Sequence, residues 1–181
     1  MTISTENLLN KLIELTQEHL AFAESLLLKT DAELNKRLTN ESWSVLECLE
    51  HLNLYGNFYL PEIKNRIETS TTKATVEFKS GWLGNYFAQS MLPKDNLNKM
   101  KAFKSMNPIH SSLSKNTVTV FIDQQKQLLD LLNASRAVNL NKVKTSISIT
   151  TLIKLKLGDT FRFLIYHNKR HIVQAQKVLV N

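Results

Sequence analysis

The sequence has little cysteine, proline or glycine. Its 181 residues include 1 Cys, 3 Pro and 4 Gly. The lone Cys48 excludes an internal disulfide, so we expect a reducing, cytoplasmic setting. Few Gly and Pro, together with 43% hydrophobic residues, favour a helix-rich globular chain over a disordered one. A chain of this length predicts a single domain over residues 1–181.

Long apolar runs are also absent. The best candidate, residues 20–28, is interrupted by Glu24 and is shorter than the ~18 residues that a transmembrane helix needs. The first ten residues are polar and lack the basic stretch with which a signal peptide begins. We therefore expect neither a signal peptide nor a membrane partner.

Acidic residues are scarce in the second part of the chain. Residues 1–70 hold 6 Lys or Arg and 11 Asp or Glu, whereas residues 71–181 hold 17 and 5, so the net charges are −5 and +12. This excess forms either a solvated surface or a basic face that attracts an anionic substrate or nucleic acid. The basic residues are scattered, and Phe103 is the sole stacking partner in residues 94–104. We therefore expect no nucleic-acid partner.

Apolar residues recur at helical spacing in four segments, at about residues 5–29, 44–67, 116–133 and 158–179. This pattern predicts an α-helical bundle with four main helices. Residues 69–116 form a long connector, in which 82–91 are expected to form a short helix. A connector of this length usually crosses the bundle or covers a site. Residues 139–156 alternate between apolar and polar types, and 145–153 are compatible with a strand.

The second helix has the clearest start signal in the chain. Ser44 and Glu47 have the spacing of a capping box, which predicts a helix that begins just after Ser44. Trp43 then precedes the cap and is expected to pack on Cys48 as a hydrophobic staple. Pro61 falls later in this helix, where we expect it to kink or split the helix.

Three histidines have the spacing of a metal site. His167 and His171 are four residues apart, so their rings share one face of the last helix. His51 lies among apolar residues of the second helix, and a buried imidazole there needs a partner. Convergence of the three on a metal ion meets that need, but such a pair also occurs by chance in helix cores. His19 and His110 are expected to be an ordinary helix position and a loop residue.

Two motifs resemble those of the DinB/YfiT-like superfamily. Residues 43–52, WSVLECLEHL, are similar to the family motif W-S-x-x-E-x-x-x-H-L, whose histidine is the first metal ligand. Residues 157–175 resemble the family's last helix, in which H-x-x-x-H has an Arg before its second His and a Gln three residues after it. Arg170 and Gln174 match these two positions.

The resemblance implies a DinB/YfiT-like four-helix bundle with up-down-down-up topology and a three-histidine metal site. That site is usually assigned nickel or zinc, and family members are often homodimers. Some members resemble S-transferases that use low-molecular-weight thiols, one isomerises a thiol adduct, and others are described as metal-dependent hydrolases. The metal ligands that it implies here are His51, His167 and His171.

Three neutral imidazoles leave one position open on a tetrahedral metal, as in catalytic sites. Either water or a thiol is activated at such a position. All-nitrogen ligands suit zinc or nickel. Tyr55 is a candidate hydrogen-bond donor or a core aromatic residue, Glu47 a candidate base or only a cap, and Gln174 a candidate for orienting an imidazole or holding substrate.

The sequence therefore favours a metal-dependent enzyme that acts on a small molecule, either as a transferase using a low-molecular-weight thiol or as a hydrolase. The alternative is a non-catalytic bundle that a metal stabilises. Both hypotheses use the same three histidines, so the ligands alone cannot choose between them.

Overall fold

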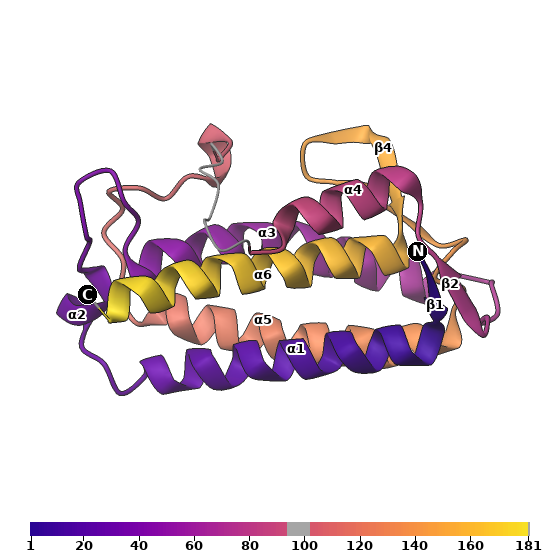
Figure 1. The fold of residues 1–181 in the computed structure, drawn as a ribbon, viewed down its shortest axis with the longest axis horizontal. Helices are drawn as coiled ribbons and strands as arrows, with labels where there is room; N and C mark the ends of the chain where they lie inside the picture. The colour runs from indigo at the N-terminus through magenta and orange to yellow at the C-terminus, as the bar shows by residue number, and fades with distance from the viewer. Residues whose placement is uncertain (94–101, 181) are drawn as a thin grey trace.

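Four long helices form a bundle in the computed structural model, which describes residues 1–93 and 102–180. They are α1 (Thr5–Leu26), α3 (Val45–Glu68), α5 (Asn116–Ala134) and α6 (Leu157–Leu179). In Figure 1, α3 and α5 run in one direction and α1 and α6 in the other. The predicted four-helix bundle is confirmed, and its up-down-down-up order is the one that the resemblance implied.

Side-chain caps explain where several of these helices begin. Ser44 and Glu47 form both hydrogen bonds of a capping box at the start of α3, as predicted. Thr30 and Glu33 form a second capping box that starts the short helix α2 (Asp31–Asn35). Ser4 accepts a hydrogen bond from the Asn7 N–H at the start of α1.

Of the two outcomes expected at Pro61, a kink or a split, the structure excludes the split. The helix continues from Val45 to Glu68 with Pro61 inside it. Proline removes one backbone hydrogen bond from a helix interior, which costs ~3 kcal/mol or more. Tyr59, Leu60 and Ile63 around it are at most 5% exposed, so packing of this stretch against the bundle keeps it helical.

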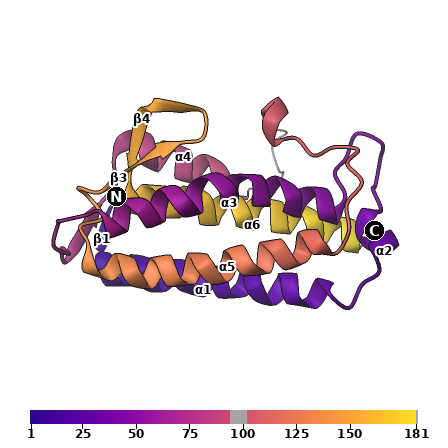
Figure 2. The same cartoon turned by 180° about the vertical axis from the view of Figure 1, so that it is seen from behind.

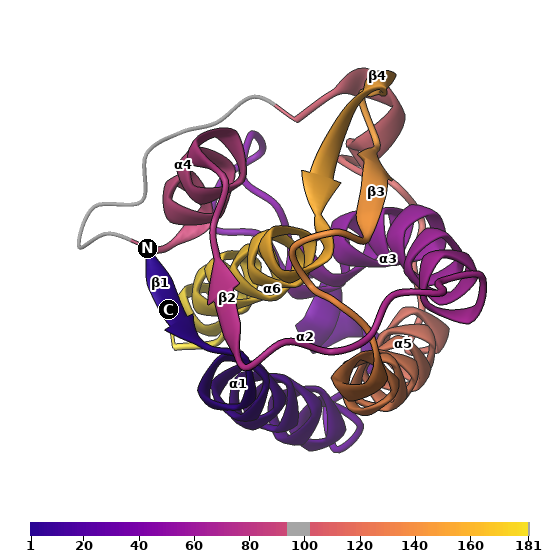
Figure 3. The same cartoon turned by 90° about the vertical axis from the view of Figure 1, so that its right-hand side faces the viewer.

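The long connector between α3 and α5 contains its own elements. β2 (Glu77–Lys79) pairs antiparallel with β1 (Thr2–Ser4), which joins the connector to the start of α1. The predicted short helix is α4 (Trp82–Met91), and it packs along α6 through its buried residues Gly84, Ala88 and Met91 (Figure 3). The 3₁₀ turn η1 (Lys104–Met106) follows. Residues 94–101 of the basic segment considered above lie outside the described residues.

A β-hairpin precedes the last helix. After the 3₁₀ turn η2 (Ser135–Ala137), β3 (Lys144–Ile147) pairs antiparallel with β4 (Thr150–Lys156), and β4 leads directly into α6 (Figure 2). Residues 145–153, which are compatible with one strand, instead contain parts of two strands and the turn between them. The chain is therefore mostly but not purely helical.

Among the residues that the structure describes, the core consists of two apolar clusters. One includes Leu8, Tyr59, Phe78 and Phe161, and the other includes Cys48, Phe121 and Val178. None of the described helices is both long and apolar enough to cross a membrane.

Candidate metal centre

The three predicted ligands meet between α3 and α6. His51 lies in the second turn of α3, while His167 and His171 lie one turn apart on α6. Each offers one ring nitrogen, and these three atoms are within 4.8 Å of one another. Each residue is at most 9% exposed. Within residues 1–93 and 102–180, no other group of three His, Cys, Asp or Glu side chains converges in this way.

Hydrogen bonds fix the orientation of two of these rings. His51 Nδ1 donates to the backbone carbonyl of Met106 at 2.5 Å, and His171 Nδ1 donates to Gln174 Oε1 at 3.0 Å. A carbonyl oxygen can only accept, so both Nδ1 atoms carry the proton. The lone pairs of His51 and His171 therefore lie on Nε2. Such partners orient imidazoles in metal sites.

The third ring leaves the cluster short of hydrogens. His167 Nε2 lies 3.1 Å from His51 Nε2, and His167 Nδ1 is buried and has no hydrogen-bond partner within residues 1–93 and 102–180. Since a neutral His167 has one N–H, at most one hydrogen lies among the three converging nitrogens. One hydrogen cannot satisfy both the His51 and the His171 lone pairs, whereas a divalent cation can accept all three. The donor set therefore fits a metal ion.

The electrostatics of the cluster keep the rings neutral. Burial lowers the pKa of His51 to about 4. Burial, followed by the nearby charge of His51, lowers the pKa of His171 to about 3. The pKa of His167 lies well below its ordinary value because the ring is buried and faces both other histidines. At neutral pH all three imidazoles thus offer lone pairs, which metal binding requires.

Comparison with known proteins identifies the family. The model of the DinB superfamily matches residues 11–175, which is most of the chain. The chain belongs to the DinB superfamily. Comparison with curated protein sequences finds no match.

A solved structure shares the fold of this DinB-superfamily chain. It is YfiT from Bacillus subtilis, described as a probable metal-dependent hydrolase with an unusual four-helix bundle topology. The two chains superpose with a TM-score of 0.59 over 97% of this chain and 87% of that chain, at 15% sequence identity. At 15% identity, this likeness shows a shared fold and nothing more.

Aromatic rings surround the histidines of this DinB-superfamily centre. The Trp43 ring centroid lies 4.7 Å from that of His51 and 5.5 Å from that of His171. The Tyr55 ring centroid lies 5.0 Å from that of His51 and 4.6 Å from that of His167. The Phe163 ring stacks on that of His167, with 5.8 Å between the centroids. Burial raises the pKa of Tyr55, so its hydroxyl remains a hydrogen-bond donor at neutral pH.

The Glu47 carboxylate is fully engaged. Its Oε2 accepts hydrogen bonds from the Ser44 N–H and Arg37 Nε, while its Oε1 accepts from Arg37 Nη2 and the His110 N–H. Burial acts to raise the pKa of Glu47, but these hydrogen bonds outweigh it and the pKa lies below its ordinary value. The arrangement matches the capping function considered for Glu47 and adds contacts with Arg37 and His110.

Several contributors to the centre were not predicted. Met106 acts through its backbone carbonyl, so its side-chain type gave no signal. Trp43 borders the apolar cluster that contains Cys48, as expected of a staple, but its ring also lies against His51 and His171. Its position just before the cap of the His51 helix was the available signal. His19, expected at an ordinary helix position, lies on α1 and is buried, and neither of its ring nitrogens has a hydrogen-bond partner among the described residues.

Proposed function

We propose that this protein is a metal-dependent hydrolase that acts on a small molecule, with its metal ion held by His51, His167 and His171. One observation carries the proposal. The Nδ1 atoms of His51 and His171 donate hydrogen bonds, so the lone pairs of these rings lie on their Nε2 atoms. One ring nitrogen of each of the three histidines then lies within 4.8 Å of the others. Three neutral imidazoles with a further position open is the ligand pattern of catalytic metal sites.

The donor set also suggests the kind of metal. Neutral imidazoles with no carboxylate suit zinc or nickel better than magnesium or calcium. When bound, a divalent ion of this kind supplies Lewis acidity and lowers the pKa of water or of a thiol beside it.

The surrounding side chains have distinct tasks in this proposal. The Tyr55 hydroxyl donates a hydrogen bond to a substrate oxygen, because its raised pKa keeps the proton in place. Gln174 accepts a hydrogen bond from His171 Nδ1 and so fixes the orientation of that ring. Trp43 and Phe163 exclude water from the two flanks of the histidine cluster. We assign no proton transfer to Glu47, since four donors already occupy its oxygens.

Thiol transfer is the second candidate, because the same ligands would also hold a metal that deprotonates a low-molecular-weight thiol. We place hydrolysis first because the structural neighbour YfiT is described as a probable metal-dependent hydrolase. A homodimer, as in many family members, remains a prediction.

The test is a substrate panel assayed with metal-free protein and with protein loaded with zinc or nickel. Esters and amides are assayed alone, and electrophiles are assayed with a small thiol. We expect metal-dependent hydrolysis in the parent and in a His19→Leu control, and none in His171→Ala. Turnover that requires the thiol would instead identify a transferase. A metal that raises the melting temperature without any turnover would favour the non-catalytic bundle.

A further inference from the structure

One stretch of the connector, residues 102–113, lies against the histidine cluster. From it, the Met106 carbonyl accepts the Nδ1 proton of His51. The next residue, Asn107, accepts a hydrogen bond from Trp43 Nε1 through its side-chain oxygen at 3.2 Å. We call residues 102–113 the covering segment. It therefore contacts both a metal ligand and an aromatic neighbour of two ligands.

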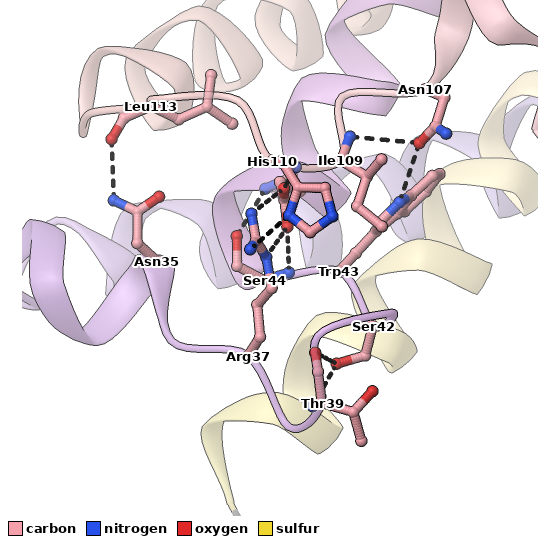
Figure 4. A network of polar contacts seen from close by, with 11 residues as sticks. Asn35, Arg37, Thr39, Ser42, Trp43, Ser44, Asn107, Ile109, His110 and Leu113 are labelled. Carbon is pink, nitrogen blue, oxygen red and sulfur yellow. Dashed lines mark hydrogen bonds and ion pairs between the residues drawn. The ribbon is translucent and has the colours of Figure 1, made fainter.

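The covering segment is anchored a few residues further on. The His110 N–H donates to Glu47 Oε1 at 2.5 Å, and Arg37 Nη1 donates to His110 Nδ1 at 2.9 Å. Asn35 Nδ2 donates to the Leu113 carbonyl at 2.9 Å. Figure 4 shows this network, in which Arg37 and His110 meet beside Ser44 at the start of α3.

Glu47 lies at the centre of the anchor. It is completely buried, and Arg37 pairs with both of its oxygens at 2.8 and 2.6 Å. Two-point contacts of this kind between guanidinium and carboxylate are strong and directional. The same carboxylate caps α3 one turn before His51. Glu47 therefore holds both partners of the His51–Met106 hydrogen bond: the helix that carries the ring and the segment that carries the carbonyl.

We propose that Glu47, supported by Arg37, is a positioning residue of the metal centre. By holding the His110 backbone, it keeps the Met106 carbonyl on His51 Nδ1 and thereby keeps His51 Nε2 directed at the metal. This inference rests on the proposed function for the metal itself, but the orientation of His51 is a property of the protein without metal. The competing explanation is that Glu47 only starts the helix.

Two substitutions at His110 separate these explanations, because this residue is exposed and lies in a loop. Its φ is 64°, a conformation that glycine adopts freely and proline cannot. His110→Gly keeps the N–H that Glu47 binds. His110→Pro removes that N–H and forces the backbone out of its conformation, while the capping box stays intact. We expect only the proline variant to disturb His51.

A second pair of variants addresses Glu47 directly. Glu47→Gln preserves a residue type that capping boxes accept, but an amide has one oxygen for the four donors and cannot pair with Arg37 on both sides. Ser44→Ala is the matched control, because it removes the other half of the capping box and leaves the anchor of the covering segment untouched.

Two measurements decide the outcome. Chelator competition should show that zinc affinity falls about 10- to 100-fold in His110→Pro and Glu47→Gln, the usual range for loss of a partner that orients a ligand, and changes little in His110→Gly and Ser44→Ala. Nitrogen-15 NMR of the metal-free protein should show the His51 proton on Nδ1 in the parent and both controls, and a mixture of tautomers in the other two variants.

Unchanged zinc affinity together with an unchanged His51 tautomer in His110→Pro would overturn the proposal, as would equal losses in Ser44→Ala and Glu47→Gln. A parent that binds no metal would refute the proposed function, and the NMR comparison would then still decide whether Glu47 positions His51. If Glu47→Gln does not fold, the two His110 variants carry the test alone.

Discussion

Helix α6 carries two buried polar clusters that differ in whether their polar groups satisfy one another. Near its start, Arg162 donates to Asp159 at 3.0 Å, to Ser80 at 2.8 Å and to Asn85 at 3.0 Å. About 12 Å further along the helix axis from Asp159, counting 1.5 Å per residue, His167 begins the histidine cluster. The first cluster neutralises its own charge, whereas the second directs more lone pairs at one point than it has hydrogens to offer. The first therefore supports the fold and the second fits a ligand.

His19 on α1 extends this comparison. It is 3% exposed, and burial, followed by the charge of Lys169, lowers its pKa to about 3. These values resemble those of His171, yet His19 belongs to no converging group among the described residues. Burial and a lowered pKa are thus insufficient to mark a metal ligand. Convergence of oriented nitrogens is the additional requirement.

The largest effect on stability should come from breaking the ion pair between Asp159 and Arg162. Asp159→Asn leaves the Arg162 charge buried without its partner, and we expect the free energy of unfolding to fall by about 3–5 kcal/mol in urea titrations. Asp123→Asn, an exposed control on α5, should change it by less than about 0.5 kcal/mol. Metal bound per folded chain should not change. A loss below about 1 kcal/mol would mean that the ion pair does not support the fold.

The next effect concerns the histidine cluster and should depend on added metal. At a free zinc concentration 100 times the dissociation constant, we expect the parent to gain about 2.7 kcal/mol in free energy of unfolding. His171→Ala loses one of three ligands and should show almost no gain at the same concentration. Thermal or urea unfolding with and without zinc measures the difference. An equal gain in the variant would show that the stabilising metal binds elsewhere.

A smaller effect is expected from His19, in the pH dependence of the free energy of unfolding. Because its pKa is about 3 in the folded protein and near 6.5 in an unfolded chain, the unfolded state binds a proton below pH 6.5 that the folded state does not. The free energy of unfolding therefore falls as the pH drops from 6.5 toward 3. Between pH 7.5 and 5 this costs about 2 kcal/mol for one histidine.

His19→Leu should remove that share of the pH dependence, so the stability curve of the metal-free variant should be flatter than that of the parent. Urea titrations at pH 7.5 and 5 provide the measurement. Equal slopes for the two proteins would show that His19 takes up a proton without unfolding.

Local rules made part of the candidate site predictable from the sequence, whereas the grouping of His51 with His167 and His171 on one metal ion was implied by the family resemblance. A helix places His167 and His171 on one face, and a capping box fixes where the helix that carries His51 begins. The bundle followed from helical periodicity for the same reason. The length of the connector predicted that it crosses the bundle or covers a site, but its contacts were not predictable. The covering segment is held by hydrogen bonds that join residues 35–51 to residues 106–113. Backbone acceptors in loops leave no pattern of residue types.

Glu47 illustrates the limit most clearly. Its spacing from Ser44 predicted the capping box, and that prediction is confirmed. Its contacts with Arg37 and the His110 backbone depend on the path of the covering segment, which joins α3 only in the folded chain. One carboxylate therefore has a function that local spacing predicts and another that only the tertiary structure shows.

The central claim is that His51, His167 and His171 together hold one metal ion. X-ray absorption at the zinc edge, combined with metal analysis, tests it most directly. We expect about one zinc per chain with three imidazole ligands, and loss of binding when any of the three histidines is replaced by alanine. The claim would be contradicted if the parent retained almost no zinc or nickel after loading, or if the alanine variants bound zinc as tightly as the parent.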